Sequence, residues 1–349
     1  MRYLAVKLIP KSFIHLGERE KWLEGSRVHI PSDTLFSALC HCFLLLYGEV
    51  EDLLQGFISG DAPFLISSAF PWWDGDFYFP LPKNQLAFGE KLAESSEKDL
   101  KQVRYVNQVL LIRLLSGENL SELVDEIKSN FTLKCLPDLG RYESKNKNLA
   151  EKDLPTLSVD YEGVAWRTED VPRVALNRFN NHPGENFFHF GQVAYADRAG
   201  LFVLVMIKKK EWLEKIKALF RLLADEGIGG DRSCGKGLFR QPEFLEVEFP
   251  EIESVEAEYA LSCYFPRENE ITGLDESYYE LEERKGYIFS PLNRSFRRRS
   301  LRVFTEGSVF KGGISRVGRL VDTKPEVFDK HPVYRYGYLF SIPCRMEPK

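Results

Sequence analysis

The segment from residue 227 to residue 237 reads GIGGDRSCGKG and is the most informative part of the chain for its fold. Five of these eleven residues are glycine, which lets a backbone adopt left-handed conformations and approach a ligand closely. Successive N–H groups in such a loop form a concave nest for anions, and the basic side chains add positive charge. The pattern predicts a phosphate-binding loop; the alternative is a tight connection that binds nothing. The residues predicted to contact phosphates are Gly229, Gly230, Asp231, Arg232, Ser233, Gly235 and Lys236.

Residues 230–236 also match G-x-x-x-x-G-K, which is most of the nucleotide-binding P-loop motif. The motif continues with Ser or Thr, whose hydroxyl binds magnesium, but residue 237 is glycine. A P-loop also follows a strand and opens a helix, whereas this loop follows a predicted helix and opens a predicted strand. The sequence therefore argues against ATP binding, and we predict no cofactor and no metal.

Hydrophobic periodicity predicts the elements around this loop. Trp212, Ile216 and Leu223 share one face of a helix over residues 210–226, and a strand follows over residues 238–249. Pro242 in that strand favours an edge position or a bulge.

Further upstream, strands are predicted over residues 2–9, 63–69, 76–81 and 201–207, and an apolar, buried helix over residues 35–47. Residues 88–130 are predicted to be helical, and residues 171–199 to form an irregular hairpin. The order of the elements is that of a β-α-β-β-α-β ferredoxin-like fold with an expanded middle, so the predicted fold class is α+β.

The length of 349 residues suits two domains. We predict an N-terminal ferredoxin-like domain over residues 1–250, with an insertion at about 82–199 that includes the hairpin at about 171–199. Residues 251–349 begin again with a strand at 258–265 and continue with strands near 286–310 and 333–343. This second part is predicted to be a reduced ferredoxin-like (RRM-like) unit.

The composition predicts a globular protein of the cytoplasm. Hydrophobic residues make up 44% of the chain, including 26 Phe and 15 Tyr, which is enough for a large core. No run of about 18 apolar residues is present, and the first seven residues alternate like a strand instead of forming a signal peptide. The six cysteines form no CxxC pair, and Cys40 and Cys42 do not face each other on a helix, which favours inert thiols over a metal site.

Charge is distributed unevenly along the chain. The net charge is −5, but residues 290–320 hold eight basic residues and only one acidic residue, Glu306. Residues 241–285 hold 14 acidic and three basic residues. Arg297, Arg298 and Arg299 are interleaved with nearby aromatic residues, which suits a surface that follows a nucleic-acid backbone and stacks bases. The alternative is a strand with buried aromatic side chains beneath a solvated charged face.

Two further segments are candidate RNA contacts. Ser32 is predicted to cap the helix over residues 35–47, with Asp33 at the positive end of its dipole, and a capped helix start can hold a phosphate. Arg173 and Arg178 lie on opposite faces of an extended segment, so that one meets phosphate while the other braces the hairpin. The alternatives are simple helix capping and two solvated arginines.

Four segments together resemble a known family. They are residues 32–39 (SDTLFSAL), 172–178 (PRVALNR), 306–309 (EGSV) and 331–337 (HPVYRYG). With a glycine-rich loop after the second helix of a ferredoxin-like fold, they resemble the RAMP superfamily of CRISPR proteins, and within it the fourth subunit of type III-A (Csm) interference complexes. Asn177 departs from the pattern, which has Asp there, so no carboxylate role is implied at that position.

The resemblance implies a function. Such subunits cap the guide RNA by binding its 5′ handle, dock onto the large polymerase-like subunit and contact the first backbone RAMP subunit. A thumb-like hairpin, here residues 171–199, props apart one base pair of the guide–target duplex, so target RNA is a second ligand. These subunits are not regarded as nucleases, so we expect no catalytic residue and no membrane partner.

The main alternative is a metal-independent endoribonuclease of the same superfamily that processes guide RNA. Such enzymes often use histidine as general acid or base, because its pKa lies near the working pH. His15 and His29 flank the first loop, and His182 and His189 lie in the predicted hairpin. His41 is predicted to be buried in its helix. The spacing indicates no Tyr, Lys or Ser partner for any of them. The histidines are His15, His29, His41, His182, His189 and His331. A protein-only scaffold is the third alternative.

Overall fold

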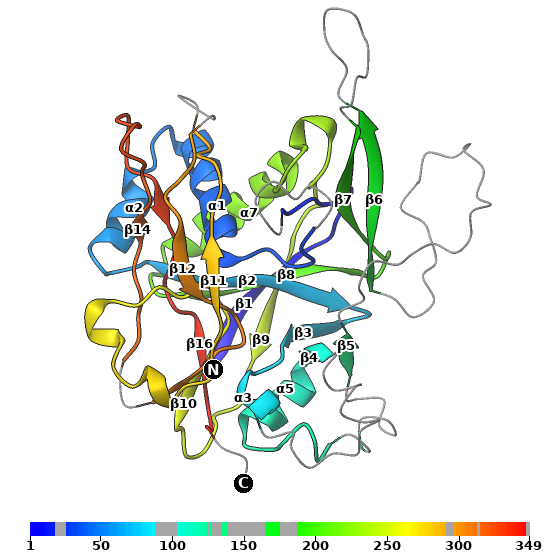
Figure 1. Cartoon of the computed structure of the whole chain (residues 1–349), viewed down its shortest axis with the longest axis vertical. Helices are drawn as coiled ribbons and strands as arrows, with labels where there is room; N and C mark the ends of the chain where they lie inside the picture. Colours follow the sequence, from blue (N-terminus) through cyan, green and yellow to red (C-terminus); the bar gives the residue numbers. More distant parts are fainter. Residues whose placement is uncertain are drawn as a thin grey trace, which may run out of the picture.

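A seven-stranded antiparallel sheet lies at the centre of the molecule, in the order β5-β4-β3-β2-β8-β1-β9 (Figure 1). The computed structural model describes residues 1–17, 26–87, 103–123, 126, 134–137, 165–174, 187–290, 296–312 and 315–346. Within these ranges, no helix is both long and apolar enough to cross a membrane.

Four strands form the ferredoxin-like unit that the sequence predicts. They are β1 (Arg2–Leu8), β2 (Phe64–Trp73), β8 (Ala199–Ile207) and β9 (Glu243–Glu248), and they lie side by side as β2-β8-β1-β9. Helix α1 (Ser32–Tyr47), followed by the short α2 (Glu51–Ile58), connects β1 to β2, and α7 (Trp212–Glu226) connects β8 to β9. The predicted α+β class is therefore confirmed, and β9 occupies the sheet edge, directly after Pro242 as predicted.

Helices α1 and α7 pack together through apolar faces. Leu35 and Leu39 of α1 and Ile216 and Leu223 of α7 are buried, which confirms the predicted helical periodicity. Gly48 ends α1 with a φ of 83° and donates its N–H to the Leu44 carbonyl. The last turn of α1, residues 45–47, is between 44% and 51% exposed, so the predicted burial on all sides is wrong there.

Three strands of the insertion extend the sheet beyond β2: β3 (Asp76–Pro80), β4 (Val103–Asn107) and β5 (Cys135–Pro137). The helix predicted over residues 88–130 is therefore wrong at residues 103–107, where Val106 pairs with Phe79 of β3 and is fully buried. The helix that does form here, α5 (Gln108–Leu115), starts where the Asn107 side chain accepts the Leu110 N–H at 3.2 Å. Residues 88–102 lie outside the described ranges, and a one-turn helix, α3 (Asn84–Ala87), precedes them.

The predicted hairpin is more regular than expected. Strands β6 (Trp166–Val174) and β7 (Phe187–Tyr195) pair in continuous antiparallel register, from Trp166 with Tyr195 to Val174 with Phe187. The hairpin extends to one side of the molecule, with α7 between it and α1 (Figure 1). The hairpin starts at Trp166, five residues before the predicted start, and Ala199, the last residue of the predicted range, is the first residue of β8.

The C-terminal part, residues 251–346, consists of small antiparallel sheets. Strands β10 (Ala257–Ala260), β13 (Val309–Lys311) and β16 (Ser341–Cys344) form one in the order β13-β10-β16. Strands β11 (Leu281–Arg284) and β12 (Leu301–Phe304) form a pair, as do β14 (Val321–Asp322) and β15 (Tyr334–Arg335). Among the described residues of this part the only helical turns are of the 3-10 type, η2 (Glu268–Glu270) and η3 (Leu274–Glu276). Its classification as a reduced ferredoxin-like unit stays a prediction.

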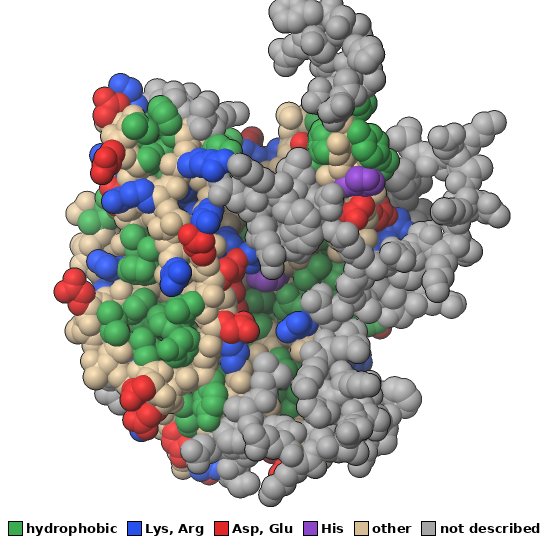
Figure 2. Space-filling model, viewed as in Figure 1, with side chains coloured by type: hydrophobic (Ala, Val, Ile, Leu, Met, Phe, Trp, Pro, Cys, Tyr) green, Lys and Arg blue, Asp and Glu red, His purple; other side chains and the backbone are tan. Residues whose placement is uncertain are grey.

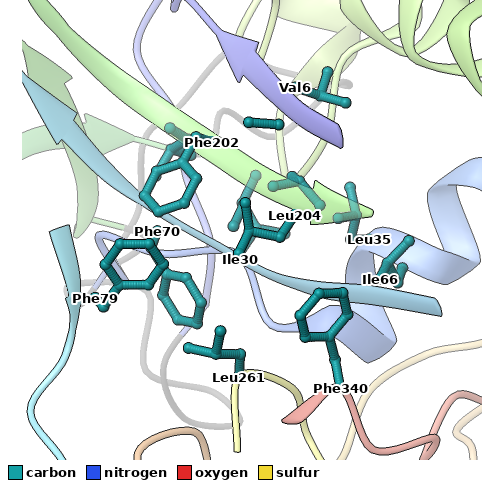
Figure 3. Packing of buried hydrophobic residues seen from close by; sticks show 14 of the residues in the cluster. Val6, Ile30, Leu35, Ile66, Phe70, Phe79, Phe202, Leu204, Leu261 and Phe340 are labelled. Atoms are coloured by element: carbon teal, nitrogen blue, oxygen red, sulfur yellow. The ribbon is translucent and has the colours of Figure 1, made fainter. Parts of the chain in front are cut away.

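One hydrophobic core joins the two parts of the chain. Leu261 and Phe340 of the C-terminal part belong to the same buried cluster as Ile66 and Phe79 of the large sheet (Figure 3). Because of this shared core, each part buries some of its apolar surface against the other, while the C-terminal part also has two small clusters of its own. The predicted domain boundary near residue 250 stays a prediction.

Candidate nucleic-acid interface

The glycine-rich loop, residues 227–237, owes two of its glycines to close backbone packing. Gly229 has a φ of 92°, and a Cβ there would lie 2.3 Å from the carbonyl oxygen of His15. Gly237 has a φ of 74°, and a Cβ there would lie 2.0 Å from the carbonyl oxygen of Ile228. Both positions therefore require glycine for the fold itself, whatever the loop binds.

The loop uses part of its predicted anion nest internally. Gly230 donates its N–H to the His15 carbonyl at 2.9 Å, and Gly235 donates to the Arg232 carbonyl at 2.9 Å. The predicted phosphate contacts of these two N–H groups are therefore wrong in this conformation. The loop tip, residues 233–235, overlaps the 3-10 turn η1 (Arg232–Cys234) and is exposed, so Ser233 is accessible. Arg232 is half-buried, and the Lys236 side chain is only 12% exposed.

On one side the loop contacts the β6–β7 hairpin through charged and aromatic groups. The Arg173 guanidinium lies 2.5 Å from the Asp231 carboxylate and 4.3 Å from the centre of the Phe190 ring. The Lys236 ammonium lies 4.4 Å from the same ring and donates to the Gln192 side chain at 2.7 Å. We call Arg173, Phe190, Asp231 and Lys236 the hairpin site. Arg178, the other predicted arginine, lies outside the described residues.

Burial lowers the pKa of Lys236 and of the neighbouring His15. Burial and the nearby Arg173 lower the pKa of Lys236, while the Asp231 carboxylate opposes that shift. His15 packs with its ring centre 4.0 Å from that of Phe190, and its Nδ1 lies 2.6 Å from the Gly191 carbonyl. Burial lowers the pKa of His15, so this ring is neutral at neutral pH and supports the hairpin by packing.

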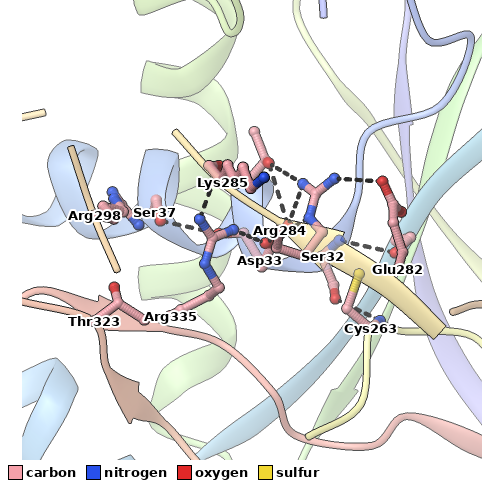
Figure 4. Close-up of polar contacts among 12 residues, drawn as sticks. Ser32, Asp33, Ser37, Cys263, Glu282, Arg284, Lys285, Arg298, Thr323 and Arg335 are labelled. Atoms are coloured by element: carbon pink, nitrogen blue, oxygen red, sulfur yellow. Dashed lines mark hydrogen bonds and ion pairs between the residues drawn. The ribbon is translucent and has the colours of Figure 1, made fainter. Parts of the chain in front are cut away.

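The start of α1 forms a buried ionic cluster instead of an exposed phosphate site. The Asp33 carboxylate is buried and accepts two hydrogen bonds from Arg284, at 2.9 and 3.0 Å, and a third from Arg335 (Figure 4). Burial alone would raise the pKa of Asp33, but the two guanidiniums hold it well below its usual range. We call Asp33, Arg284 and Arg335 the arginine clamp.

Ser32 is also internal. It is the first residue of α1, after Pro31 at the N-cap position, and its hydroxyl accepts the Cys263 N–H at 3.0 Å. Its own N–H donates to the Ser68 hydroxyl at 2.8 Å. The structure therefore contradicts the predicted capping role of Ser32 and the predicted RNA contacts of Ser32 and Asp33, because neither side chain is exposed.

Three of the four segments that carry the family resemblance meet at this junction. Residues 32–39 contribute Asp33, and residues 331–337 contribute Arg335 and Tyr336, whose hydroxyl accepts the Ile66 N–H at 3.2 Å. Residues 306–309 contribute Glu306, which binds the Ser68 hydroxyl and the Cys263 thiol. These segments therefore hold the two parts of the chain together.

On its other side the glycine-rich loop borders a cleft of about 270 Å³. The cleft lies between α1, the end of α7 with the loop, and segments of the C-terminal part. Charged and aromatic side chains line it: Asp33, His41, Glu226, Arg232, Arg284, Lys285, Tyr287, Phe289, Arg298 and Arg335. Sequence reasoning predicted only Asp33, Arg232 and Arg298 of these, because the others come together only through tertiary contacts.

The predicted arginine cluster divides among three positions. Arg298 lines the cleft and donates to the Tyr287 carbonyl at 3.2 Å, and burial together with Arg335 lowers its pKa to about 10. Arg297 is exposed and lies 5.4 Å from the Tyr287 ring. Arg299 is exposed and donates to the Asp322 carbonyl at 2.9 Å.

Two aromatic side chains at the cleft are paired with arginines from other segments. Tyr287 is 54% exposed and stacks with Arg297, while Phe289 is 40% exposed and lies 4.6 Å from the Arg232 guanidinium. On the face drawn in Figure 2, Lys and Arg side chains lie over the C-terminal part among Asp and Glu side chains, beside a hydrophobic patch. The loop therefore lies between two cation–aromatic groups, the hairpin site and the cleft.

Each of the remaining described histidines contacts a neighbouring side chain. His29 lies 3.2 Å from the Tyr105 hydroxyl, and Ser290 and His331 are hydrogen-bonded at 2.8 Å. His41 lines the cleft 3.9 Å from Glu226, so its predicted burial in an apolar face is wrong. His189 packs against Phe187, and His182 lies outside the described residues.

The described part of the chain offers few groups for metal binding or thiol chemistry. It holds no group of three His, Cys, Asp or Glu side chains arranged to bind a metal ion. Burial raises the pKa of Cys40 and of Cys42 to about 12, so both thiols are inert as predicted, whereas Cys234 is exposed at the loop tip.

Comparison with known families identifies the class of protein. The sequence model of the RAMP superfamily matches residues 19–240, which is more than half of the chain. The chain therefore belongs to the RAMP superfamily, as its ferredoxin-like unit and glycine-rich loop predict. A second model, of the CRISPR Csm4 C-terminal domain, matches residues 253–344.

Full-length relatives agree with this assignment. The CRISPR system Cms protein Csm4 of Thermococcus onnurineus (strain NA1) is 28% identical over 346 residues, covering 98% of this chain and 96% of the relative. The protein of the same name from Methanocaldococcus jannaschii is 24% identical over 386 residues, covering 98% and 97%.

Solved structures share the fold. A chain in the crystal structure of a Csm1-Csm4 cassette in complex with cA4 superimposes with a TM-score of 0.60 at 19% identity, covering 100% of both chains. A chain of the Csm3-Csm4 subcomplex in the type III-A CRISPR-Cas interference complex gives a TM-score of 0.58 at 19% identity, covering 99% of this chain and 100% of the other. The resemblance predicted from the sequence is thereby confirmed at the level of family and fold.

Proposed function

We propose that the chain is a non-catalytic RNA-binding subunit of a type III-A CRISPR (Csm) complex in the cytoplasm, and that it binds the 5′ handle of the guide RNA. The observation that carries this proposal is the position of the glycine-rich loop between the hairpin site and the cleft. Both groups combine cations with aromatic rings, which is how proteins hold a single strand: phosphates meet Arg and Lys, and bases stack on rings. The glycine-rich loop contacts the β6–β7 hairpin on one side and borders the cleft along α1 on the other, so one RNA strand can contact the hairpin site, the loop and the cleft.

The hairpin has the features of a wedge for a duplex end. Val174 and Phe187 face each other across β6 and β7 at the outer end of the described hairpin, and they are 46% and 63% exposed. Exposed apolar side chains at such a position suit stacking on an unpaired base. We propose that the hairpin separates one base pair where guide and target RNA meet.

The proposed protein partners follow from the complexes of the relatives. Solved assemblies pair Csm4 with Csm1 and with Csm3, and we propose the corresponding large polymerase-like and backbone RAMP subunits as partners of this chain. The C-terminal part exposes apolar side chains that include Ile271, Tyr279 and Leu281, which supports a protein contact there.

We also propose the division into residues 1–250 and 251–349 as two domains that dock through a shared core. In this proposal the second is a reduced ferredoxin-like unit whose helices are replaced by the turns η2 and η3. The arginine clamp and Glu306 hold the two units in a fixed orientation, which keeps the cleft open between them.

Handle recognition is tested by measuring binding of the full chain to labelled guide RNA whose 5′ handle is intact, removed or scrambled. We expect at least tenfold tighter binding to the intact handle, and intact RNA in a parallel metal-free incubation. Equal affinity for all three RNAs contradicts handle recognition. Metal-free cleavage that is lost in His15→Ala or His29→Ala supports the processing-enzyme alternative instead.

A further inference from the structure

The cleft beside the glycine-rich loop has the dimensions of a site for one nucleotide. Its lining runs along α1 from Asp33 to Cys42, a distance of about 14 Å at the helical rise of about 1.5 Å per residue. Its volume of about 270 Å³ lies just below the range of about 300–1,000 Å³ that is usual for ligand sites. The ligand is therefore a single small unit and not a folded segment.

The cleft has an excess of positive charge. Five Arg and Lys side chains line it, against Asp33 and Glu226, and Arg284 and Arg335 already occupy the Asp33 carboxylate. In the described part of the chain, no carboxylate lies within ion-pair distance of Arg232 or Arg298. Arg298 is half-buried, and a partly desolvated guanidinium without a carboxylate partner favours a bound anion such as phosphate.

Aromatic side chains line part of the cleft. Phe289 lies against the Arg232 guanidinium at 4.6 Å and meets the His41 ring edge-on at 4.9 Å. Tyr287, two residues earlier, is paired with Arg297 in the same way. Aromatic and guanidinium planes of this kind stack with an unpaired base.

The remaining carboxylate in the cleft suggests which base is preferred. Glu226 ends α7, its side chain is 38% exposed, and it lies 3.9 Å from His41 Nε2. A carboxylate accepts two hydrogen bonds side by side, and guanine presents the N1–H and N2–H donors side by side on its Watson–Crick edge. Uracil presents a single N–H there, and adenine and cytosine present one amino group beside an acceptor.

We infer that the cleft holds one unstacked nucleotide of the bound RNA and favours guanine. The phosphate faces Arg232 and Arg298, the base stacks at Phe289, and its Watson–Crick edge meets Glu226. This assignment rests on the proposed function, because the nucleotide belongs to the RNA that the chain binds.

The test uses the full chain and four labelled RNAs: octa-uridine, and octa-uridine with one central nucleotide replaced by G, A or C. We expect the G-containing RNA to bind about tenfold more tightly than octa-uridine, as a bidentate base contact is worth about 1–3 kcal/mol. Glu226→Gln, which replaces one acceptor by a donor, is expected to reduce this preference below threefold. The matched control Glu246→Gln, on the exposed edge strand β9, keeps the preference.

A second pair of variants tests the phosphate contact. Arg298→Ala is expected to weaken binding of all four RNAs about equally, while Arg2→Ala, which removes an exposed cation outside the cleft, has less than a twofold effect. A thermal unfolding midpoint equal to that of the parent chain shows that Glu226→Gln and Arg298→Ala are folded.

Four results would overturn the inference or its basis. Equal binding of all four RNAs by the parent chain removes the base site but leaves the RNA-binding function intact. An undiminished preference in Glu226→Gln removes the role of that carboxylate. Competition by free GMP at the same concentration as the G-containing RNA identifies a free nucleotide as the ligand. Failure to bind any RNA, handle RNA included, refutes the proposed function itself.

Discussion

Arginines on the two sides of the cleft differ in what balances their charge. Arg284 and Arg335 are almost fully buried and share the Asp33 carboxylate, whereas Arg232 and Arg298 line the same cleft without a carboxylate within ion-pair distance in the described residues. The first pair is committed to the fold, because a buried guanidinium that loses its partner is costly. The second pair is available to a ligand. Identical side chains therefore have different functions according to the partner that the tertiary structure supplies.

The largest effect is expected at the arginine clamp. Among the described residues, Asp33→Ala leaves the buried Arg335 without an ion pair and Arg284 with only Glu282, at 3.4 Å. It should lower the free energy of unfolding by about 3–5 kcal/mol, measured by urea denaturation. The control is Asp231→Asn, which removes the partly exposed ion pairs to Arg173 and Lys236 and tolerates the left-handed backbone there, and it should cost less than about 1 kcal/mol. An equal decrease in the free energy of unfolding in the two variants would show that the clamp stabilises the fold no more than the ion pairs of the loop do.

The next effect is expected in RNA binding. Arg232→Ala combined with Lys236→Ala removes two predicted phosphate contacts and should weaken handle binding at least tenfold near 0.1 M salt. The slope of log K against log salt concentration should fall by about 1.4, since each phosphate contact with a single strand contributes about 0.7. Removing two exposed cations elsewhere, with Arg2→Ala and Lys330→Ala, should leave the slope unchanged. An unchanged slope in the loop variant would exclude both residues from the interface.

Acid should weaken the arginine clamp. The pKa of Asp33 in the folded chain lies well below the value of about 3.9 for an unfolded Asp, so as the pH falls the unfolded chain binds the proton first. The contribution of the ionised Asp33 to the free energy of unfolding is complete above about pH 5, and about 1.3 kcal/mol of it is lost by pH 3. Comparing the pH dependence of unfolding between the parent chain and Asp33→Asn isolates this group, and identical curves would show that Asp33 does not titrate in this way.

The smallest effect is expected at the hairpin site. Arg173→Ala removes the ion pair to Asp231, which at its partial exposure is worth about 0.2–1 kcal/mol. Amide hydrogen exchange in β6 and β7 should accelerate up to about fivefold, with no change in β1 or β8. Acceleration throughout the large sheet would mean that this ion pair supports the whole fold and not only the hairpin.

The large sheet was predictable because its signals are local. The alternation in β1 and the helical spacing of Trp212, Ile216 and Leu223 each reflect one buried face, and Pro242 marked the edge strand. At residues 103–107 the prediction failed because a short apolar run has no clear period. Its strand conformation is decided by pairing with β3.

The candidate site was only partly predictable. The glycine-rich loop, Arg173 and Arg298 were identified from residue type and spacing, but Ser32 and Asp33 were assigned to RNA because a helix start has the same sequence pattern whether it is exposed or buried. The segment 331–337 was noticed for its resemblance, without any indication that Arg335 binds Asp33 across the chain.

The sequence by itself determined the family, the order of the strands and helices in the ferredoxin-like unit, and the glycine-rich loop. These depend on the periodicity and conformational freedom of neighbouring residues. Only the tertiary structure decided which charged groups are paired, which N–H groups of the loop are already used, and where the cleft lies. Those properties depend on contacts between residues such as Asp33 and Arg335, 302 positions apart, and on the burial that sets the energy of each charge.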